Sequence, residues 1–392
     1  MRMTDRLHEA MAARVSAGEF PGIVTLIARE DDVRVDTIGV TEFGGSRAMR
    51  RDTVFRVTSM TKPVVAAAAM ALVEEGSLDL EEPVDRLLPE LSDRRVLARI
   101  DGPLDDTVPA SRAITVHDVL TYRMGFGFLI EPTFDPPFPI VTEPARIGLA
   151  LGAPDPRTVH DPDEWIRLFG TLPLMYQPGE RWQYNVAGHV LGVLVARAAG
   201  RPLGDVLQER IFTPLGMTET GFRLPADRAA DLPAQYQADD GCRLVENPLT
   251  GPDVWSRPPA FPSGAGGLVS TADDYLSFAR LLLARGVHGG RRLLSERSVE
   301  LMTTNHLTPA QIAGGGVLLG GNGWGFGMAV TVQPDEVSAV PGRYGWSGGY
   351  GTTWFNDPHD GLIAIALTQV SDFLWSGALT EFDRLAYSLT SG

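Results

Sequence analysis

The stretch from Thr53 to Gly76, TVFRVTSMTKPVVAAAAMALVEEG, contains the features from which we predict both the fold and the chemistry. An alanine-rich apolar run ends at Gly76, as is typical of a helix. Pro63 stands near its start, where the missing N–H of a proline costs little. Thr58 or Ser59 is expected to cap this helix through its side-chain oxygen.

Ser59 and Lys62 stand three residues apart at the start of the predicted helix, so their side chains share one face. A neutral lysine amine in this place could take the proton of the serine hydroxyl. The helix N-terminus favours developing negative charge, and the backbone N–H of Ser59 could line an oxyanion hole. Although Ser-x-x-Lys is a short motif, it indicates a serine nucleophile with a lysine base.

Lys62 is the only lysine of the chain, because 33 of the 34 basic residues are arginine. Arginine does not give up its proton in proteins, whereas a buried lysine does so readily. A lysine that survived by chance on the surface is the alternative interpretation. The position of Lys62 one helical turn from Ser59 favours the catalytic interpretation.

The segments on either side of this helix predict the domain organisation. Residues 22–40 alternate like a β-hairpin, and residues 323–332, 342–357 and 362–370 resemble strands. Helical spacing marks residues 114–126 and 186–199, whereas residues 131–163 are rich in proline and aspartate and are expected to be irregular.

This order of elements predicts an α+β fold with an antiparallel sheet flanked by helices. We expect residues 1–90 and 260–392 to form the sheet domain and residues 91–259 to form a mainly helical insert. The active site is then predicted in the cleft between these two domains.

Composition and charge narrow the range of partners. The 392-residue chain has a net charge of −15, which argues against nucleic acid and anionic membranes as partners. No stretch approaches the ~20 apolar residues of a membrane span, and residues 1–20 do not resemble a signal peptide, so we expect a cytoplasmic protein. The sequence does not indicate an oligomeric state.

Metal, cofactor and thiol chemistry have little support in the sequence. The seven histidines show no metal-ligand spacing, so we predict no metal and no other cofactor. The glycine-rich residues 314–323 lack the Lys-Ser/Thr pair of a phosphate-binding loop. Cys242, the single cysteine, lies between Gly241 and Arg243 in a turn-like stretch and is a poor candidate nucleophile.

Two further segments carry candidate functional residues. Tyr184, at the start of a predicted helix, could exchange a proton with Ser59 and Lys62 if the lysine ammonium lowered the pKa of the phenol. A core aromatic is the alternative. Residues 345–351, GWSGGYG, combine apolar bulk with glycines that let a backbone approach a ligand.

The same glycine-rich segment also fits Gly-x-Ser-x-Gly, the nucleophile elbow of α/β-hydrolases, with Ser347 as the serine. An elbow needs a helix directly after its serine. Here the following residues predict a strand, a turn and a strand. Only His359 follows as a histidine, and it lies within that turn, so we reject this assignment.

Taken together, these segments resemble one family. The chain is similar to the serine β-lactamase and penicillin-binding-protein superfamily, and specifically to the family VIII carboxylesterases that resemble class C β-lactamases. The resemblance covers residues 5–390 and implies a β-lactamase/transpeptidase-like fold. The stretches that carry it are FRVTSMTKP, LTYRMGF, PGERWQYNVAG, IFTPLGMTETGF, GAGGLVSTADD and GWGFGM.

The resemblance implies a role for each matching residue. Ser59 would be the acylated nucleophile, with Lys62 and Tyr184 as its proton-transfer partners. The backbone N–H groups of Ser59 and Gly349 would form the oxyanion hole. The residues expected to contact the substrate are Tyr122, Asn185, Val186, Trp346, Ser347 and Gly348.

Two departures from the β-lactamase pattern affect the expected substrate. Val186 stands where β-lactamases have the asparagine that holds the substrate amide, and Asn185 precedes it. Trp346 replaces the cation that would pair with a β-lactam or peptide carboxylate. Both changes favour a neutral small-molecule ester, with a short to medium acyl chain, over a β-lactam.

Three other functions stay open at this point. A β-lactamase or D-amino peptidase would use the same residues. An acyltransferase of the lovastatin-biosynthesis type would use the same serine with an alcohol as acceptor. A non-catalytic homologue that only binds a ligand is the alternative from a different class.

Overall fold

The computed structural model describes residues 3–129, 137–152, 159–239, 241–248 and 251–388. Its largest element is a seven-stranded sheet in the order β11-β12-β13-β14-β15-β1-β2, in which every neighbouring pair is antiparallel. These strands are β1 Gly22–Arg29, β2 Asp32–Gly39, β11 Gly323–Trp324, β12 Ala329–Val330, β13 Tyr344–Gly348, β14 Thr352–Asp357 and β15 Leu362–Thr368.

Strands from the two ends of the chain pair with each other within this sheet. β1 pairs with β15 over seven residues, from Ile23 opposite Thr368 to Arg29 opposite Leu362. Both strands are almost completely buried, as expected for strands that are covered on both faces. The prediction that one antiparallel sheet is built from both ends of the chain is therefore confirmed.

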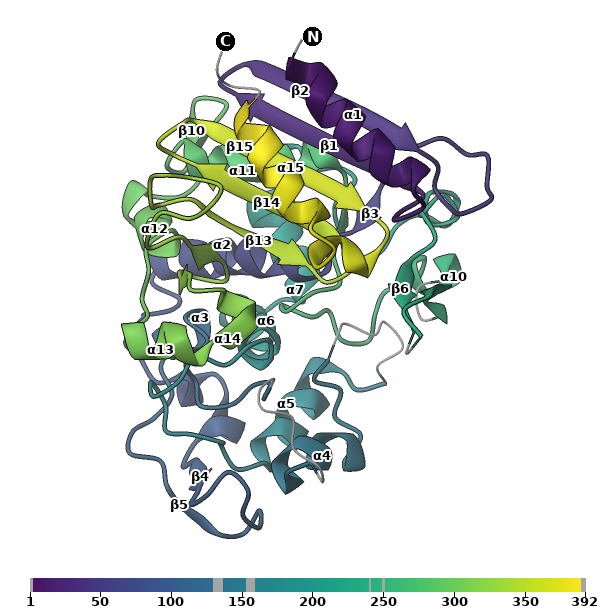
Figure 1. Ribbon diagram of the computed structural model, residues 1–392. Coiled ribbons are helices and arrows are strands. Elements are labelled where there is room, and N and C mark those ends of the chain that lie inside the picture. The colour runs from purple at the N-terminus through teal and green to yellow at the C-terminus, as the bar shows by residue number, and fades with distance from the viewer. Residues whose placement is uncertain (1–2, 130–136, 153–158, 240, 249–250, 389–392) are drawn as a thin grey trace.

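Helices cover both faces of the sheet (Figure 1). The helices α1 Met3–Ser16 and α15 Ala378–Ser388 lie on one face, and α2 Thr61–Glu74 and α11 Ala272–Leu283 lie on the other. Eleven of the fourteen residues of α2 are buried. An alanine-rich helix suits this central position because its short side chains let neighbouring elements approach closely.

The remaining elements connect and surround this framework. The short strands are β3 Phe55–Arg56, β4 Arg95–Leu97, β5 Thr107–Pro109, β6 Tyr236–Ala238, β7 Leu244–Glu246, β8 Val269–Ser270, β9 Val287–His288 and β10 Arg291–Arg292. The other helices are α3 Val116–Leu120, α4 Pro139–Arg146, α5 Pro162–Gly170, α6 Val186–Ala199, α7 Leu203–Leu207, α8 Thr213–Leu215, α9 Ala226–Ala229, α10 Pro252–Trp255, α12 Glu296–Met302, α13 Pro309–Gly314 and α14 Gly316–Leu319. Single helical turns are η1 Thr58–Met60, η2 Val84–Arg86, η3 Pro89–Leu91, η4 Gln208–Phe212 and η6 Ser371–Leu374.

Several local expectations need correction. Neither Thr58 nor Ser59 caps α2, because the 3₁₀ turn η1 runs directly into the helix and uses backbone hydrogen bonds instead. Within residues 114–126 only α3 is helical, since the chain turns away after Leu120. Residues 137–152, which we expected to be irregular, contain α4; residues 130–136 and 153–158 lie outside the described residues.

Helix α6 packs closely against residues 263–265. The contact depends on glycine, because a Cβ on Gly264 would stand 2.3 Å from the carbonyl oxygen of Gly188, and a Cβ on Gly188 would stand 2.9 Å from Ala265 Cα. The backbone of Ala265 is thereby held next to the first turn of α6, which follows Tyr184 and Asn185. Within the described ranges, no helix has the length and hydropathy needed to cross a membrane.

Candidate active site

Ser59 lies in the turn η1, between α2 and the end of β13. The turn is held in a defined backbone conformation, since the buried Thr58 has a φ of 38°. Gly348 of β13 comes so close that a Cβ there would stand 2.3 Å from the Val57 carbonyl oxygen. Ser59 itself is partly exposed. The hydroxyl is therefore presented at the rim of the sheet by a rigid turn.

Lys62 is completely buried, and its amine faces Ser59. The Nζ atom donates hydrogen bonds to Ser59 Oγ (2.9 Å), Asn185 Oδ1 (3.0 Å) and the carbonyl oxygen of Ala265 (2.6 Å). Burial holds the pKa of the Lys62 ammonium well below its usual value, because a charged amine loses its hydration there. A neutral amine at this position is able to accept the proton of Ser59.

Tyr184 closes the other side of the serine. Its ring lies 4.6 Å from Lys62 Nζ, and its hydroxyl accepts a hydrogen bond of 2.8 Å from the indole N–H of Trp346. Burial raises the pKa of Tyr184 to about 12, although hydrogen bonds with Ser59 and Trp346 oppose this shift. The expectation that the lysine lowers this pKa is wrong, so Tyr184 stays protonated and is suited to donate a proton.

Asn185 contacts Lys62 rather than the cavity next to Ser59. Its backbone is in an unusual conformation, with φ 79°, which turns the side chain towards the lysine. The Nδ2 atom donates to the carbonyl oxygens of Leu151 (2.8 Å) and Gly152 (3.2 Å), so the amide orientation leaves Oδ1 for the lysine. Val186 is also buried, in the first turn of α6.

His189 extends this hydrogen-bond network. The Nδ1 atom lies 2.8 Å from Ser263 Oγ, and Nε2 lies 3.2 Å from the Leu151 carbonyl oxygen. Ser263 Oγ accepts from the N–H of Ala265, whose carbonyl accepts from Lys62. Burial and the nearby Lys62 charge lower the pKa of His189 to about 4, so the ring is neutral at physiological pH. A closed set of hydrogen bonds thus surrounds the lysine.

The end of β13 borders Ser59 on its open side. Trp346, Ser347 and Gly349 line a cavity of about 550 Å³ together with Ser59 and Tyr184. Gly348 is buried against the turn η1 and does not line this cavity. Ser347 Oγ lies 2.9 Å from Thr353 Oγ1 on the neighbouring strand β14, which gives this serine no base.

Tyr122 does not occupy the position that we expected for a substrate contact. Its side chain is 1 % exposed, its ring stacks behind Tyr184 with a centroid distance of 6.3 Å, and its hydroxyl has no partner among the described residues. Tyr122 therefore supports Tyr184 from behind. The sequence also predicts that the proline- and aspartate-rich segment near Phe134 to Phe138 shapes the pocket, and residues 134–136 of this segment lie outside the described residues.

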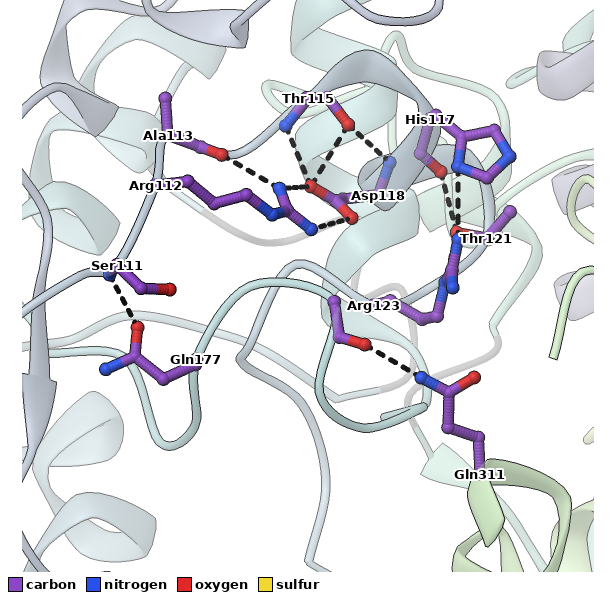
Figure 2. Close-up of polar contacts among 11 residues, drawn as sticks. Ser111, Arg112, Ala113, Thr115, His117, Asp118, Thr121, Arg123, Gln177 and Gln311 are labelled. Atoms are coloured by element: carbon purple, nitrogen blue, oxygen red, sulfur yellow. Dashed lines mark hydrogen bonds and ion pairs between the residues drawn. The ribbon is translucent and has the colours of Figure 1, made fainter. Parts of the chain in front are cut away.

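A set of polar contacts holds the loop that leads to Tyr184 (Figure 2). Gln311 Nε2 of α13 donates to the carbonyl oxygen of Gly179, and Ser111 N donates to Gln177 Oε1. On the neighbouring helix α3, burial would raise the pKa of Asp118, but its hydrogen bonds with Arg112 and Thr115 hold the pKa below the usual value. These contacts fix residues 177–179 on both sides.

Sequence reasoning missed three contributors to this site: the carbonyl of Ala265, the carbonyl of Leu151, and the pair of His189 with Ser263. His189 follows Asn185 by four residues, so their shared helix face was a usable signal. The two carbonyl groups carried no signal, because any residue supplies a backbone oxygen. Among the described residues, no three histidine, cysteine or carboxylate side chains converge as a metal site would require.

A serine whose hydroxyl faces a buried lysine at the rim of an antiparallel sheet defines a class of proteins, the serine hydrolases and acyl-transfer enzymes with this fold. Residues 7–385 match the Beta-lactamase family model, and the chain belongs to the β-lactamase family. The predicted β-lactamase/transpeptidase-like fold is thereby confirmed.

Individual relatives agree with this assignment. Protein Rv1367c of Mycobacterium tuberculosis is 41% identical over 366 residues, covering 90% of this chain and 86% of the relative. Esterase EstB of Burkholderia gladioli is 33% identical over 380 residues, covering 92% and 88%. The solved structure of EstCE1, described as a hydrolase with promiscuous acyltransferase activity, is 26% identical with a TM-score of 0.79, covering 100% of this chain and 98% of that one.

Proposed function

We propose that this protein is a carboxylesterase of the family VIII type, which cleaves neutral carboxylic esters through an acyl-enzyme on Ser59. The observation that carries the proposal is the 2.9 Å contact between Ser59 Oγ and the amine of a completely buried Lys62. The similarity to an esterase, at 33% identity, supports the choice of an ester as substrate.

In the acylation step, Ser59 Oγ attacks the ester carbonyl carbon while its proton passes to the neutral Lys62 amine. The carbonyl oxygen takes up the electron pair and is stabilised by the N–H groups of Ser59 and Gly349. The bond to the alcohol oxygen then breaks. That oxygen takes a proton from the Tyr184 hydroxyl, which recovers one from the Lys62 ammonium.

In the deacylation step, a water molecule gives one proton to Lys62 and attacks the acyl carbon. The bond to Ser59 Oγ breaks, and this oxygen takes a proton from the Tyr184 hydroxyl, which recovers one from the Lys62 ammonium. The carboxylic acid then leaves, and Lys62 is neutral again. The high pKa of Tyr184 fits the role of proton donor at both stages, since the phenol is protonated before each transfer.

The direct test is Ser59→Ala, measured with a chromogenic butyrate ester. We expect turnover to fall to the background rate, and a serine-reactive phosphonate to label the wild type at Ser59 but not the variant. In Ser347→Ala the label should remain on Ser59, which separates the two candidate serines. Near wild-type turnover in Ser59→Ala, or a folded wild type that neither reacts with the phosphonate nor hydrolyses any ester, would contradict the proposal.

An acyltransferase activity is a second candidate, favoured by the similarity to EstCE1. It would use the same acyl-enzyme, with an alcohol replacing water in the second step. The ratio of ester to acid formed when an alcohol is added measures this competition. For a β-lactamase activity the site is less suited, because the apolar Trp346 replaces the cation that would pair with a β-lactam carboxylate. Turnover of a cephalosporin measures this activity directly.

A further inference from the structure

The cavity next to Ser59 continues far beyond the reacting groups. It follows β13 away from the serine and passes Ser347 and Gly345 before it reaches Arg343. Arg343 stands six residues before Gly349, and a strand rises roughly 3.3 Å per residue, so the cavity extends about 20 Å along the strand. A small ester such as methyl acetate would fill only the part of the cavity next to Ser59.

The walls of the long part are mostly apolar. On one side they are formed by α14, and on the other side by η6 and the first turns of α15, which lies across the sheet next to β13 and β14 (Figure 1). Val317 and Trp375 form part of the lining and are 56% and 68% exposed, although side chains of this kind are normally covered. The lining also contains the apolar residues Leu318, Leu319, Ala329, Phe355, Leu374 and Leu379, among others.

Small residues along β13 leave room for a chain in this cavity. Gly345 and Ser347 stand opposite Phe355 and Thr353 of β14 and share their face of the sheet. A Cβ on Gly345 would stand 2.1 Å from the Trp354 carbonyl oxygen, so glycine is needed here for the close approach of β14. From Gly349 to Gly345 the apolar part is about 13 Å long, which corresponds to an extended alkyl chain of roughly eight to ten carbons.

The far end of the cavity is polar and limits the chain length. Arg343 donates a hydrogen bond of 2.6 Å to Asp335, and its guanidinium lies 5.3 Å from the centre of the Phe355 ring. Asp383 of α15 also lines this end. An alkyl chain longer than the apolar part would have to displace water from these charged groups, which is unfavourable.

The position of Tyr184 indicates which half of an ester enters this cavity. Tyr184 is the group from which the departing alcohol oxygen takes its proton in the proposed mechanism, and it lines the cavity together with its hydrogen-bond donor Trp346. The oxygen that Tyr184 serves belongs to the alcohol. The chain that continues from this oxygen therefore begins at the wall of this cavity.

We propose that this cavity is the alcohol subsite, and that the substrates are esters of elongated, unbranched apolar alcohols of roughly eight to ten carbons. This inference rests on the proposed esterase function and adds the substrate class to it. The acyl half is left outside the long apolar part, which agrees with a short acyl chain.

A pair of isomeric esters tests the proposal in the wild-type protein. Octyl acetate and methyl nonanoate contain the same atoms, but the long chain is on the alcohol side in the first and on the acyl side in the second. We expect kcat/KM to be about tenfold or more higher for octyl acetate, because each methylene that is buried in the apolar part of the cavity favours binding of its chain. Equal values, or a preference for methyl nonanoate, would overturn the proposal.

Two variants test whether the preference for octyl acetate arises in this cavity. Leu379→Trp places a larger side chain in the apolar part of the cavity, and the ratio of kcat/KM for the two isomers should fall towards one. Val108→Trp is the control, because Val108 is an exposed apolar residue of β5 that does not line the cavity, and the ratio should keep its wild-type value. A ratio that is unchanged in Leu379→Trp, with a wild-type melting temperature, would contradict the assignment.

Rates are expressed per Ser59 labelled by the phosphonate, so the outcomes of the two proposals are distinguishable. A folded protein that does not react with the phosphonate and hydrolyses neither isomer refutes the esterase function, and the alcohol subsite falls with it. A protein that is labelled and hydrolyses both isomers without preferring octyl acetate retains its esterase function and refutes only the subsite.

Discussion

The two sides of Ser59 differ in almost every physical respect. On the side of Lys62, the amine and its partners Asn185 and Ala265 are buried, and hydrogen bonds of 2.6–3.0 Å join them. On the side of β13, a cavity of about 550 Å³ has mostly apolar walls and an exposed tryptophan at position 375. The Lys62 side is suited to hold a proton in a defined position, and the β13 side has room for a ligand.

In the proposed function, the buried side carries the proton transfer and the cavity side selects the substrate. A buried polar network tolerates little change, because each lost partner leaves a group that is neither hydrated nor hydrogen-bonded. The volume of an apolar cavity changes when a lining side chain is replaced by another apolar one, and such a replacement leaves no polar group without a hydrogen bond. Substitutions on the lysine side should therefore affect every ester alike, whereas substitutions in the cavity should affect esters according to their shape.

The largest effect is expected for Lys62→Arg. Arginine stays protonated in proteins, so it cannot act as the base. We expect kcat/KM to fall by about 10³-fold or more for all esters, as is typical when general-base catalysis is lost. Steady-state rates with a butyrate ester measure the effect, and a melting curve shows whether the variant is folded. Substantial activity in a folded variant would disprove the role of Lys62.

The next effect concerns the packing that supports the lysine. In Gly264→Ala the new methyl group would stand 2.3 Å from the carbonyl oxygen of Gly188, so α6 and the Ala265 carbonyl must separate. We expect unfolding in urea to show a loss of about 2 kcal/mol, within the usual range for overpacking. Gly204→Ala is the control, because its Cβ meets only an ordinary contact at 3.6 Å with Phe222. Equal stabilities of the two variants would show that this close approach is not needed.

Asn185 tests how the network sets the protonation of Lys62. Activity should be lost as the pH falls through the lowered pKa of Lys62, because only the neutral amine is a base. Asn185→Asp adds a negative charge, stabilises the ammonium and moves this acidic limb of the pH–rate profile to higher pH. Asn185→Leu removes the hydrogen-bond acceptor and moves the limb to lower pH, with a loss in kcat of about tenfold. If the acidic limb lies at the same pH in both variants and in the wild type, Asn185 does not set the protonation of Lys62.

The smallest effect is expected at the boundary between the two sides. Trp346→Phe keeps an aromatic wall but removes the indole N–H that donates to the Tyr184 hydroxyl over 2.8 Å. One neutral hydrogen bond contributes about 1 kcal/mol, so kcat should fall about fivefold. The ratio of rates for octyl acetate and methyl nonanoate should stay close to the wild-type ratio. A large change in that ratio without a change in kcat would place Trp346 in substrate selection alone.

Much of the fold was predictable because its signals are local. The hairpin of β1 and β2, the helix α2 and the helix α6 follow from alternation and apolar spacing within single segments. The absence of a side-chain cap at Ser59 was not predictable, since η1 is shaped by its contact with Gly348 of β13. The helix α4 was missed because its two prolines resemble loop residues, although Pro139 lies at the start of the helix and costs it little.

For the active site, the proposed reacting groups follow from the sequence alone, because a serine and a lysine one helical turn apart are neighbours at the start of any α-helix. The surroundings of these groups depend on the tertiary structure. Burial lowers the pKa of Lys62 and raises that of Tyr184, and Asn185 turns to the lysine rather than to the cavity. These properties arise from contacts between residues more than a hundred positions apart. Desolvation and hydrogen-bond geometry depend on such contacts, and no local pattern encodes them.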